Sequence, residues 1–320
     1  MQVRGYEALL ALRSFEDARM GIREEFATPD IGGASTVAVL STPLDGTPTV
    51  GWIICHSYAL EQVDLQPIES ALARALAAGG SAVLRFHVQG YGDSQRTAEH
   101  ATLGTHLKET AEAAEFLCES TGVRSLGFIG ARFGGLVAAL AAEQAGAGAL
   151  ILWDPVVKGR AYMRRLALLS AMTELLTHGR SGESGTDPET MIEQTGVLDV
   201  QGFPLTREVF REVAAIDLSS RLSRFDGDAL ILQVSRSTIF RPDLERLAGR
   251  LRELGGRCSL EIVADPAADR FGQPRYRPAG PTRKVDTQET LIPAMISKTA
   301  GWALDVVASN RERGQAQGEL

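Results

Sequence analysis

Several residue types and patterns are scarce in this 320-residue sequence, and each scarcity excludes a class of protein. The three cysteines are an odd number at distant positions, and no Cys or His spacing fits a metal site, so we expect neither a disulfide framework nor a bound metal. No uncharged apolar run reaches the roughly 18 residues that a transmembrane helix needs. The first 20 residues are charged throughout and lack the apolar region of a signal peptide. We therefore expect a cytoplasmic protein without a membrane span.

Lysine is scarce as well, because only four of the 33 basic residues are lysine, which is typical of a GC-rich bacterial coding sequence. The formal net charge of −7 gives no electrostatic signature of nucleic-acid binding. Hydrophobic residues make up 44% of the chain and charged residues 23%, as in globular proteins, which excludes a disordered or collagen-like chain. The length fits about two domains, or one large α/β domain with an insertion.

Short apolar runs alternate along the chain with longer segments rich in alanine and leucine. The expected strands cover residues 36–40, 50–55, 81–86, 125–129, 149–153, 229–234 and 258–263. The expected helices outside the insertion cover residues 61–78, 104–119, 133–145, 243–254 and 288–307. Continuously apolar strands separated by helices are typical of a mostly parallel sheet that is covered by helices on both faces. The sequence therefore predicts an α/β protein.

Two segments interrupt this alternation. Residues 155–226 are too long for a simple crossover and predict a mainly helical cap over the carboxyl edge of the sheet, inserted into a core of residues 1–154 and 227–320. Within the cap, helices are expected at 159–177 and 206–215, on either side of a polar stretch at 179–188. The second segment, residues 265–286, is rich in Pro, Arg and Gly and predicts a long loop.

The segment Gly130-Ala-Arg-Phe-Gly-Gly135 lies between an expected strand and an expected helix, which is the context of the G-x-S-x-G nucleophile elbow. Two further segments have the matching order: Cys55-His-Ser-Tyr58 resembles an oxyanion segment, and Phe86 to Ser94 resembles the glycine-rich turn after the next strand. On these motifs the sequence resembles the α/β-hydrolase superfamily over residues 22–305. It is most similar to bacterial exosortase-associated predicted hydrolases, which also carry a Trp-Asp-Pro-Val-Val segment like Trp153 to Val157. The resemblance implies an α/β-hydrolase fold.

The sequence departs from this family at each position of the catalytic triad. Arg132 stands at the nucleophile position, and a guanidinium is always protonated and cannot attack a carbonyl carbon. The family places its general base after the last strand, but no histidine follows His178. No carboxylate follows the strand ending near Val234 until Asp243. Because triad members act as a unit, we do not expect Ser-His-Asp hydrolysis.

A guanidinium at the elbow changes the character of the expected pocket. Arg132 would lie at a helix N-terminus, where amide groups also favour an anion, and its planar fork suits a carboxylate or a phosphate. Lys158, Arg160 and other arginines of the helix at 159–177 are candidates to add positive charge. The candidate ligand-binding residues are Arg132, Phe133, Ser57, Tyr58, Asp154 and Arg236. The alternative is a salt bridge from Arg132 to Asp154 that plugs a dead site.

The sequence allows two roles each for His56 and Tyr58 in the oxyanion segment. His56 is a candidate acid/base, or it orders its loop by hydrogen bonding. Tyr58 either donates a hydrogen bond into the pocket or packs under the cap. No cofactor is expected.

Three functional hypotheses remain. The first is a triad-less protein that binds a small molecule or peptide with an anionic group, either without chemistry or as an isomerase- or epimerase-like enzyme. The second is a noncanonical esterase or acyltransferase that uses Ser94, Ser237 or Cys55 with His56 or His106. The third is a structural protein with a filled cleft, which predicts an Arg132–Asp154 contact and no open pocket. The sequence leaves a homodimer open.

Overall fold

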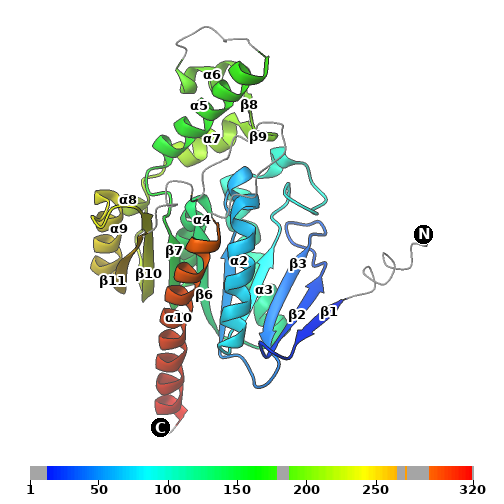
Figure 1. The fold of residues 1–320 in the computed structure, drawn as a ribbon, viewed down its shortest axis with the longest axis vertical. Helices are drawn as coiled ribbons and strands as arrows, with labels where there is room; N and C mark the ends of the chain where they lie inside the picture. Colours follow the sequence, from blue (N-terminus) through cyan, green and yellow to red (C-terminus); the bar gives the residue numbers. More distant parts are fainter. Residues whose placement is uncertain (1–12, 179–186, 265–270, 272–287, 319–320) are drawn as a thin grey trace, which may run out of the picture.

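The computed structural model describes residues 13–178, 187–264, 271 and 288–318. Nine strands form one sheet in the order β1-β2-β3-β5-β4-β6-β7-β10-β11 (Figure 1). Their bounds are β1 Ser14–Asp17, β2 Ile22–Ala27, β3 Ala38–Pro43, β4 Val50–Cys55, β5 Ala82–Phe86, β6 Ser125–Ala131, β7 Ala149–Trp153, β10 Phe225–Ser235 and β11 Gly255–Ala264. The helices outside the insertion are α2 Leu60–Ala78, η1 Ala98–His100, α3 Leu103–Thr121, α4 Arg132–Ala145, α9 Pro242–Glu253 and α10 Gln288–Gly318.

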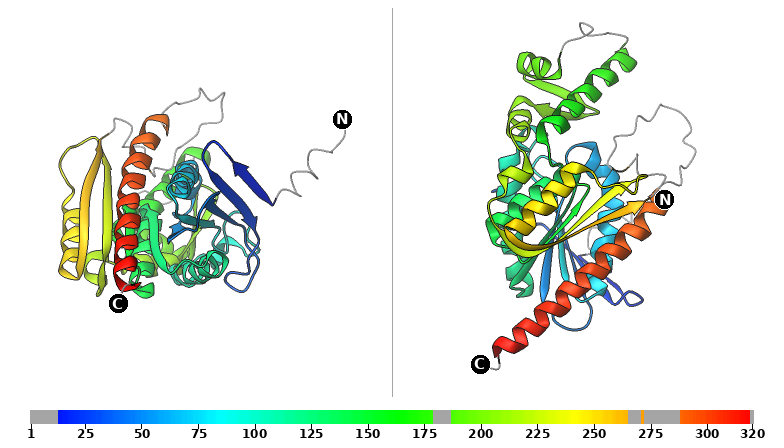
Figure 2. Two further views of the ribbon diagram at one scale, coloured as in Figure 1. Left: turned by 90° about the horizontal axis from the view of Figure 1, so that it is seen from below. Right: turned by 90° about the vertical axis from the view of Figure 1, so that its left-hand side faces the viewer.

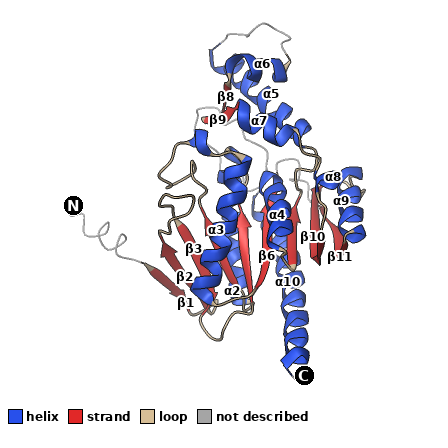
Figure 3. Cartoon of the chain, turned by 180° about the vertical axis from the view of Figure 1, so that it is seen from behind, coloured by secondary structure: helices blue, strands red, loops and turns tan. Residues whose placement is uncertain are grey.

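Within this sheet the strands β5, β4, β6, β7, β10 and β11 run parallel to one another. Strands β1, β2 and β3 pair antiparallel, and β3 also pairs antiparallel with β5. Helices α3, α4 and α9 cover one face, and α2 and α10 cover the other (Figures 2 and 3). The central strands are therefore buried on both sides, which explains their continuous apolar runs. The predicted mostly parallel sheet with helices on both faces is confirmed. Within the described residues, no helix combines the length and the apolar character needed to cross a bilayer.

The segment between β7 and β10 lies beyond the carboxyl end of the sheet (Figure 1). It contains α5 Gly159–His178, α6 Pro188–Thr195, β8 Val197–Val200, β9 Phe203–Thr206, α7 Arg207–Ala214 and α8 Leu218–Arg221. The expected helices at 159–177 and 206–215 are present, but the segment also holds an antiparallel β8–β9 hairpin that the sequence did not indicate. Gln201 and Gly202 at its turn both have positive φ, as the type I′ form of a two-residue hairpin turn requires. Most of the expected polar stretch at 179–188 and of the expected loop at 265–286 lies outside the described residues. Only residues 187, 188 and 271 of these two segments are described.

Candidate functional site

The turn from β6 into α4 has the geometry of an elbow. Arg132 has a φ of 51°, a left-handed conformation that is uncommon for a residue with a side chain. A Cβ on Gly134 would lie 2.0 Å from the carbonyl oxygen of Cys55, and one on Gly130 would lie 2.1 Å from the carbonyl oxygen of Gly134. The glycines therefore let the first turn of α4 approach the end of β4 closely. The strained position that this turn presents is occupied by Arg132.

The side chain of Arg132 is buried between two carboxylates. Its Nη1 donates to Asp154, at 2.8 Å from Oδ2 and 3.1 Å from the carbonyl oxygen. Its Nε lies 3.6 Å from Glu61 Oε1. Arg132, Asp154 and Glu61 are only 8%, 7% and 3% exposed. The Arg132–Asp154 contact that the structural hypothesis predicts is thus present.

Glu61, in the first turn of α2, forms the base of this cluster. Its Oε2 accepts hydrogen bonds from the Ser57 hydroxyl at 2.6 Å and from the Tyr162 hydroxyl at 2.9 Å. Burial raises the pKa of Glu61, against the opposing effects of the Arg132 charge and of these hydrogen bonds. The carboxyl group therefore connects the oxyanion segment, the elbow and helix α5 of the insertion.

On the other side of Arg132, the charges continue toward the end of β10. Asp154 Oδ1 accepts a hydrogen bond of 2.6 Å from Arg241 Nη1. Arg241 also donates to both carboxylate oxygens of Asp243, at 3.0 and 3.1 Å. Burial acts to raise the pKa of Asp243, but the hydrogen bonds and charge of Arg241 outweigh it and hold this pKa below its ordinary value. A series of alternating charges thus runs from Glu61 to Asp243.

A cavity of about 370 Å³ opens beside Arg132 at the carboxyl ends of β7 and β10. Its lining comprises Arg132, Asp154, Pro155, Val156, Val157, Lys158, Ala161, Tyr162, Arg165, Val234, Ser235, Arg241, Asp243 and Phe271. We call it the elbow cavity. Four of these side chains are cations and two are carboxylates. The structural hypothesis predicts no open pocket here, and the cavity contradicts that part of it.

The cations of the elbow cavity differ in how far they are already neutralised. Arg132 and Arg241 share Asp154, and Lys158 contacts Asp217. For Arg165, the described part of the chain supplies neither a hydrogen bond nor an ion pair, and its side chain is exposed at the cavity wall. Arg165 is therefore the cation with the most remaining capacity to bind an anion.

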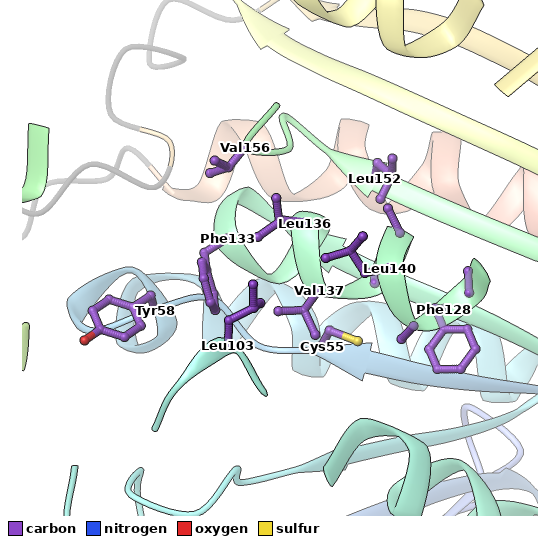
Figure 4. Close-up of a cluster of buried hydrophobic side chains, with 14 of the residues drawn as sticks. Cys55, Tyr58, Leu103, Phe128, Phe133, Leu136, Val137, Leu140, Leu152 and Val156 are labelled. Atoms are coloured by element: carbon purple, nitrogen blue, oxygen red, sulfur yellow. The ribbon is translucent and has the colours of Figure 1, made fainter. Parts of the chain in front are cut away.

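The structure brings together only part of the predicted ligand site. Arg132 and Asp154 line the elbow cavity, but the hydroxyl of Ser57 is directed to Glu61. Tyr58 packs under the insertion, where its hydroxyl donates to the carbonyl oxygen of Pro204 at 2.9 Å. Phe133 is fully buried in the hydrophobic cluster that Figure 4 shows, which also contains Tyr58.

Arg236 is exposed and does not belong to the cavity lining. Arg241, five residues later, lines the cavity in place of Arg236. The chain turns back toward the end of β10 there, where Gln233 accepts from the Arg241 amide at 2.7 Å and donates to the Ile239 carbonyl at 2.9 Å. Sequence reasoning missed Arg241, Glu61 and the role of Tyr162. The sequence did hold a signal for Arg241, which lies between the end of a parallel strand and the helix start at Pro242-Asp243. Because the carboxyl ends of parallel strands meet at one edge of the sheet, a residue in such a loop can reach the site. Glu61 had no such signal beyond its position in the first turn of a helix.

His56 lies apart from the elbow cavity. Its Nδ1 is 2.5 Å from Glu69 Oε2, both side chains are buried, and its ring centroid is 6.2 Å from that of His87. This contact fits a histidine that orders its loop through α2. His56 is not among the cavity-lining residues.

The candidate nucleophiles of the esterase hypothesis have other partners. Burial raises the pKa of the Cys55 thiol to about 12. Ser94 Oγ accepts from the Gly90 amide, and Ser237 Oγ accepts from the Ile239 amide. Burial lowers the pKa of His106 to about 4, and its Nδ1 donates to the Thr102 carbonyl at 2.6 Å. Among the residues that the structure describes, none of these three nucleophiles is hydrogen-bonded to a histidine.

Comparison of the sequence with protein-family models gives no match. Comparison with curated proteins gives none either.

Solved structures do resemble the fold. Est1E from Butyrivibrio proteoclasticus with bound ferulic acid is 19% identical with a TM-score of 0.56, over 86% of this chain and 99% of that one. Brefeldin A esterase, a bacterial homologue of human hormone-sensitive lipase, is 12% identical with a TM-score of 0.53, over 95% and 83%. An esterase from Pyrococcus furiosus is 10% identical with a TM-score of 0.50, over 77% and 85%. The parallel sheet, the helices on its two faces and these similarities together show that the chain has the α/β-hydrolase fold.

Proposed function

We propose that the protein binds a carboxylate-bearing small molecule or peptide in the elbow cavity and does not hydrolyse it. The observation that carries this proposal is Arg132, a buried guanidinium at the strained position where the fold would present a nucleophile. Arginine has no lone pair available for attack, but its donors suit a carboxylate. Asp154 and Glu61 hold the guanidinium in place, so the site is built around a cation.

The charge of the cavity wall supports an anionic ligand. Arg165 and Arg241 face the same space as Arg132, and Arg165 has no ion pair within the described residues. A ligand carboxylate placed between them would gain charge-assisted hydrogen bonds in a partly enclosed site. The volume of about 370 Å³ accommodates a compound of the size of a substituted aromatic acid.

A binding role is favoured over an isomerase-like reaction. His56, the acid/base candidate of the sequence, contacts Glu69 and does not line the cavity. The two carboxylates at the cavity both accept hydrogen bonds from arginines, so neither is a free base.

We also propose that residues 155–226 serve as the cap of a core formed by residues 1–154 and 227–320, because α5 supplies Tyr162 and Arg165 to the cavity.

Ferulate tests this proposal, because it carries a carboxylate on an aromatic body and its methyl ester has the same body without the charge. We expect calorimetric titration to show binding of ferulate and no binding of methyl ferulate. Replacing Arg165 by Gln removes a charge-assisted contact and should weaken ferulate binding about tenfold or more.

Arg160 provides the matched control, since it lies on the same helix but contacts Glu189 instead of lining the cavity. Arg160→Gln should leave ferulate binding unchanged. Equal binding of ferulate and its methyl ester, or equal losses in the two variants, would contradict the proposal.

A further inference from the structure

Strand β11 ends the nine-stranded sheet, and in the part of the chain that the structure describes no strand pairs with its outer side. In the right-hand view of Figure 2 this strand faces the viewer, between α9 and α10. It is ten residues long and contains neither proline nor lysine. Proteins commonly protect long edge strands with such residues, because unpaired backbone groups invite another strand. The edge therefore has the properties of a pairing surface.

The charges of β11 are symmetric about Ser259. Arg257 stands two residues before it and Glu261 two residues after it. If a second copy of β11 pairs antiparallel with the first and the two-fold axis passes through Ser259, each Arg257 lies directly opposite Glu261 of the other copy. Moving the centre by one residue in either direction places both charges opposite uncharged residues. One register is thus selected by charge.

The same register covers apolar side chains at the end of the sheet. Cys258 and Leu260 are only half-buried in the single chain, on the face of β11 that packs against α9. In the two-fold pairing, Cys258 of each copy lies opposite Leu260 of the other. Antiparallel pairing would therefore bury apolar surface as well as join opposite charges.

The existing partners of the two charged residues are compatible with this pairing. Arg257 binds Asp228 at 2.6 and 2.8 Å, and Lys298 of α10 lies 2.6 Å from Glu261. Both partners belong to the same copy as the residue that they contact. In the proposed pairing, negative and positive charges would alternate across the axis. Asp228 and Arg257 of one copy would be followed by Glu261 and Lys298 of the other.

One contact competes with the pairing. Arg252 of α9 donates two hydrogen bonds, of 2.7 and 3.1 Å, to the carbonyl oxygen of Cys258. This carbonyl therefore points away from β10, toward the place of the amide of Leu260 from a second copy. Arg252 protects the edge in the single chain and has to turn away when the strands pair.

We propose that two copies of the chain associate through β11, antiparallel and centred on Ser259, so that their sheets join across a two-fold axis. The partner is a second copy because the charge pattern of the strand complements itself. This association is independent of the ligand proposed for the elbow cavity.

Cross-linking at the axis tests the register. Residues opposite each other at a non-hydrogen-bonded antiparallel position have Cα atoms about 4.5 Å apart, which a disulfide can span. In a Cys258→Ser background, Ser259→Cys should give a disulfide-linked dimer under mild oxidation, seen on a non-reducing gel. Ile262→Cys in the same background is the matched control, because it keeps both charges of β11 and would lie roughly 20 Å from residue 262 of the other copy, too far to cross-link.

Sedimentation equilibrium over a concentration series tests the charges. Wild type should be dimeric, Arg257→Glu should shift at least tenfold toward monomer, and adding Glu261→Arg should restore the dimer. Arg252→Ala should strengthen association, because it frees the Cys258 carbonyl. A monomeric wild type would overturn the proposal. The proposal would also be overturned if the protein is a dimer whose dissociation constant is unchanged by Arg257→Glu and which does not cross-link through residue 259.

Discussion

Arg132 and Phe133 are neighbours at the start of α4, but they face two different regions. Arg132 lies in a group of alternating charges beside an open cavity. Phe133 lies in a group of rings, with centroids 5.5 Å from Tyr58, 5.1 Å from His106 and 6.3 Å from Tyr162. We call this second group the aromatic cluster; it also contains Tyr91 and Phe203.

The comparison shows how one turn can serve two purposes. The aromatic cluster fills the space between the sheet and the insertion, and the hydroxyl of Tyr58 fixes the hairpin above it. The charged group leaves space and concentrates donors around it. Tyr162 belongs to both regions, because its ring stacks near Phe133 and its hydroxyl donates to Glu61. We infer that the cluster provides the rigidity on which the charged site depends.

The largest effect should follow from emptying the aromatic cluster. Phe133→Ala removes a fully buried ring and should lower the free energy of unfolding by about 3–5 kcal/mol, measured by urea denaturation. Phe15→Ala, at a ring that is 46% exposed on β1, is the control and should cost less than about 1 kcal/mol. Equal costs at the two positions would show that the cluster is not a packed core.

The charged group should respond differently. Arg132→Met leaves Glu61 and Asp154 without their shared guanidinium and should lower the free energy of unfolding by about 3 kcal/mol or more. Adding Glu61→Gln should recover part of this loss, because the amide carries no charge to bury. If the single variant is as stable as wild type, the carboxylates do not depend on Arg132.

We expect His106, in the aromatic cluster, to make the free energy of unfolding depend on pH. Its pKa is about 4 in the folded protein because of burial, against an ordinary value of 6.5, so the unfolded chain binds the proton first as the pH falls. This group's contribution to stability is therefore complete above pH 6.5 and is lost progressively toward pH 4, by about 3 kcal/mol at most. The free energy of unfolding of His106→Gln should depend less on pH in this window. An unchanged pH profile would show that other groups cause the dependence.

The smallest effect concerns the link between the cluster and the hairpin. Tyr58→Phe keeps the ring and removes the hydrogen bond to Pro204, which should cost about 1 kcal/mol. Hydrogen exchange should locate the loosened amides in β8 and β9. Loosening elsewhere, with the hairpin unchanged, would mean that this hydroxyl does not hold the insertion.

Sequence patterns predicted the strands well where both faces of the strand are buried. The expected strands at 50–55 and 149–153 coincide with β4 and β7, because apolar residues occupy both faces of each. The first two strands were missed. In β2, Glu24 is buried but carries two arginine partners, Arg74 and Arg85, that come from distant segments. A buried charge of this kind interrupts the hydrophobic pattern that predicts a strand.

The candidate site was predictable only in part for a related reason. Arg132 and Asp154 follow neighbouring parallel strands, so their meeting could be inferred from the topology. Glu61 and Arg241 approach through the packing of helix starts and loops, which periodicity does not encode. Phe133 was expected at the ligand site, but adjacent helical residues point in different directions, and it lies in the core instead.

The most direct measurement is the fate of methyl ferulate in the presence of the purified protein, followed by proton NMR beside a ferulate titration. We expect the ester to remain intact at the rate of buffer alone, while ferulate shows saturable binding. Release of ferulate above the buffer rate, lost in His56→Ala, would contradict a binding role. It would identify the buried His56–Glu69 pair as the base of a displaced hydrolytic site.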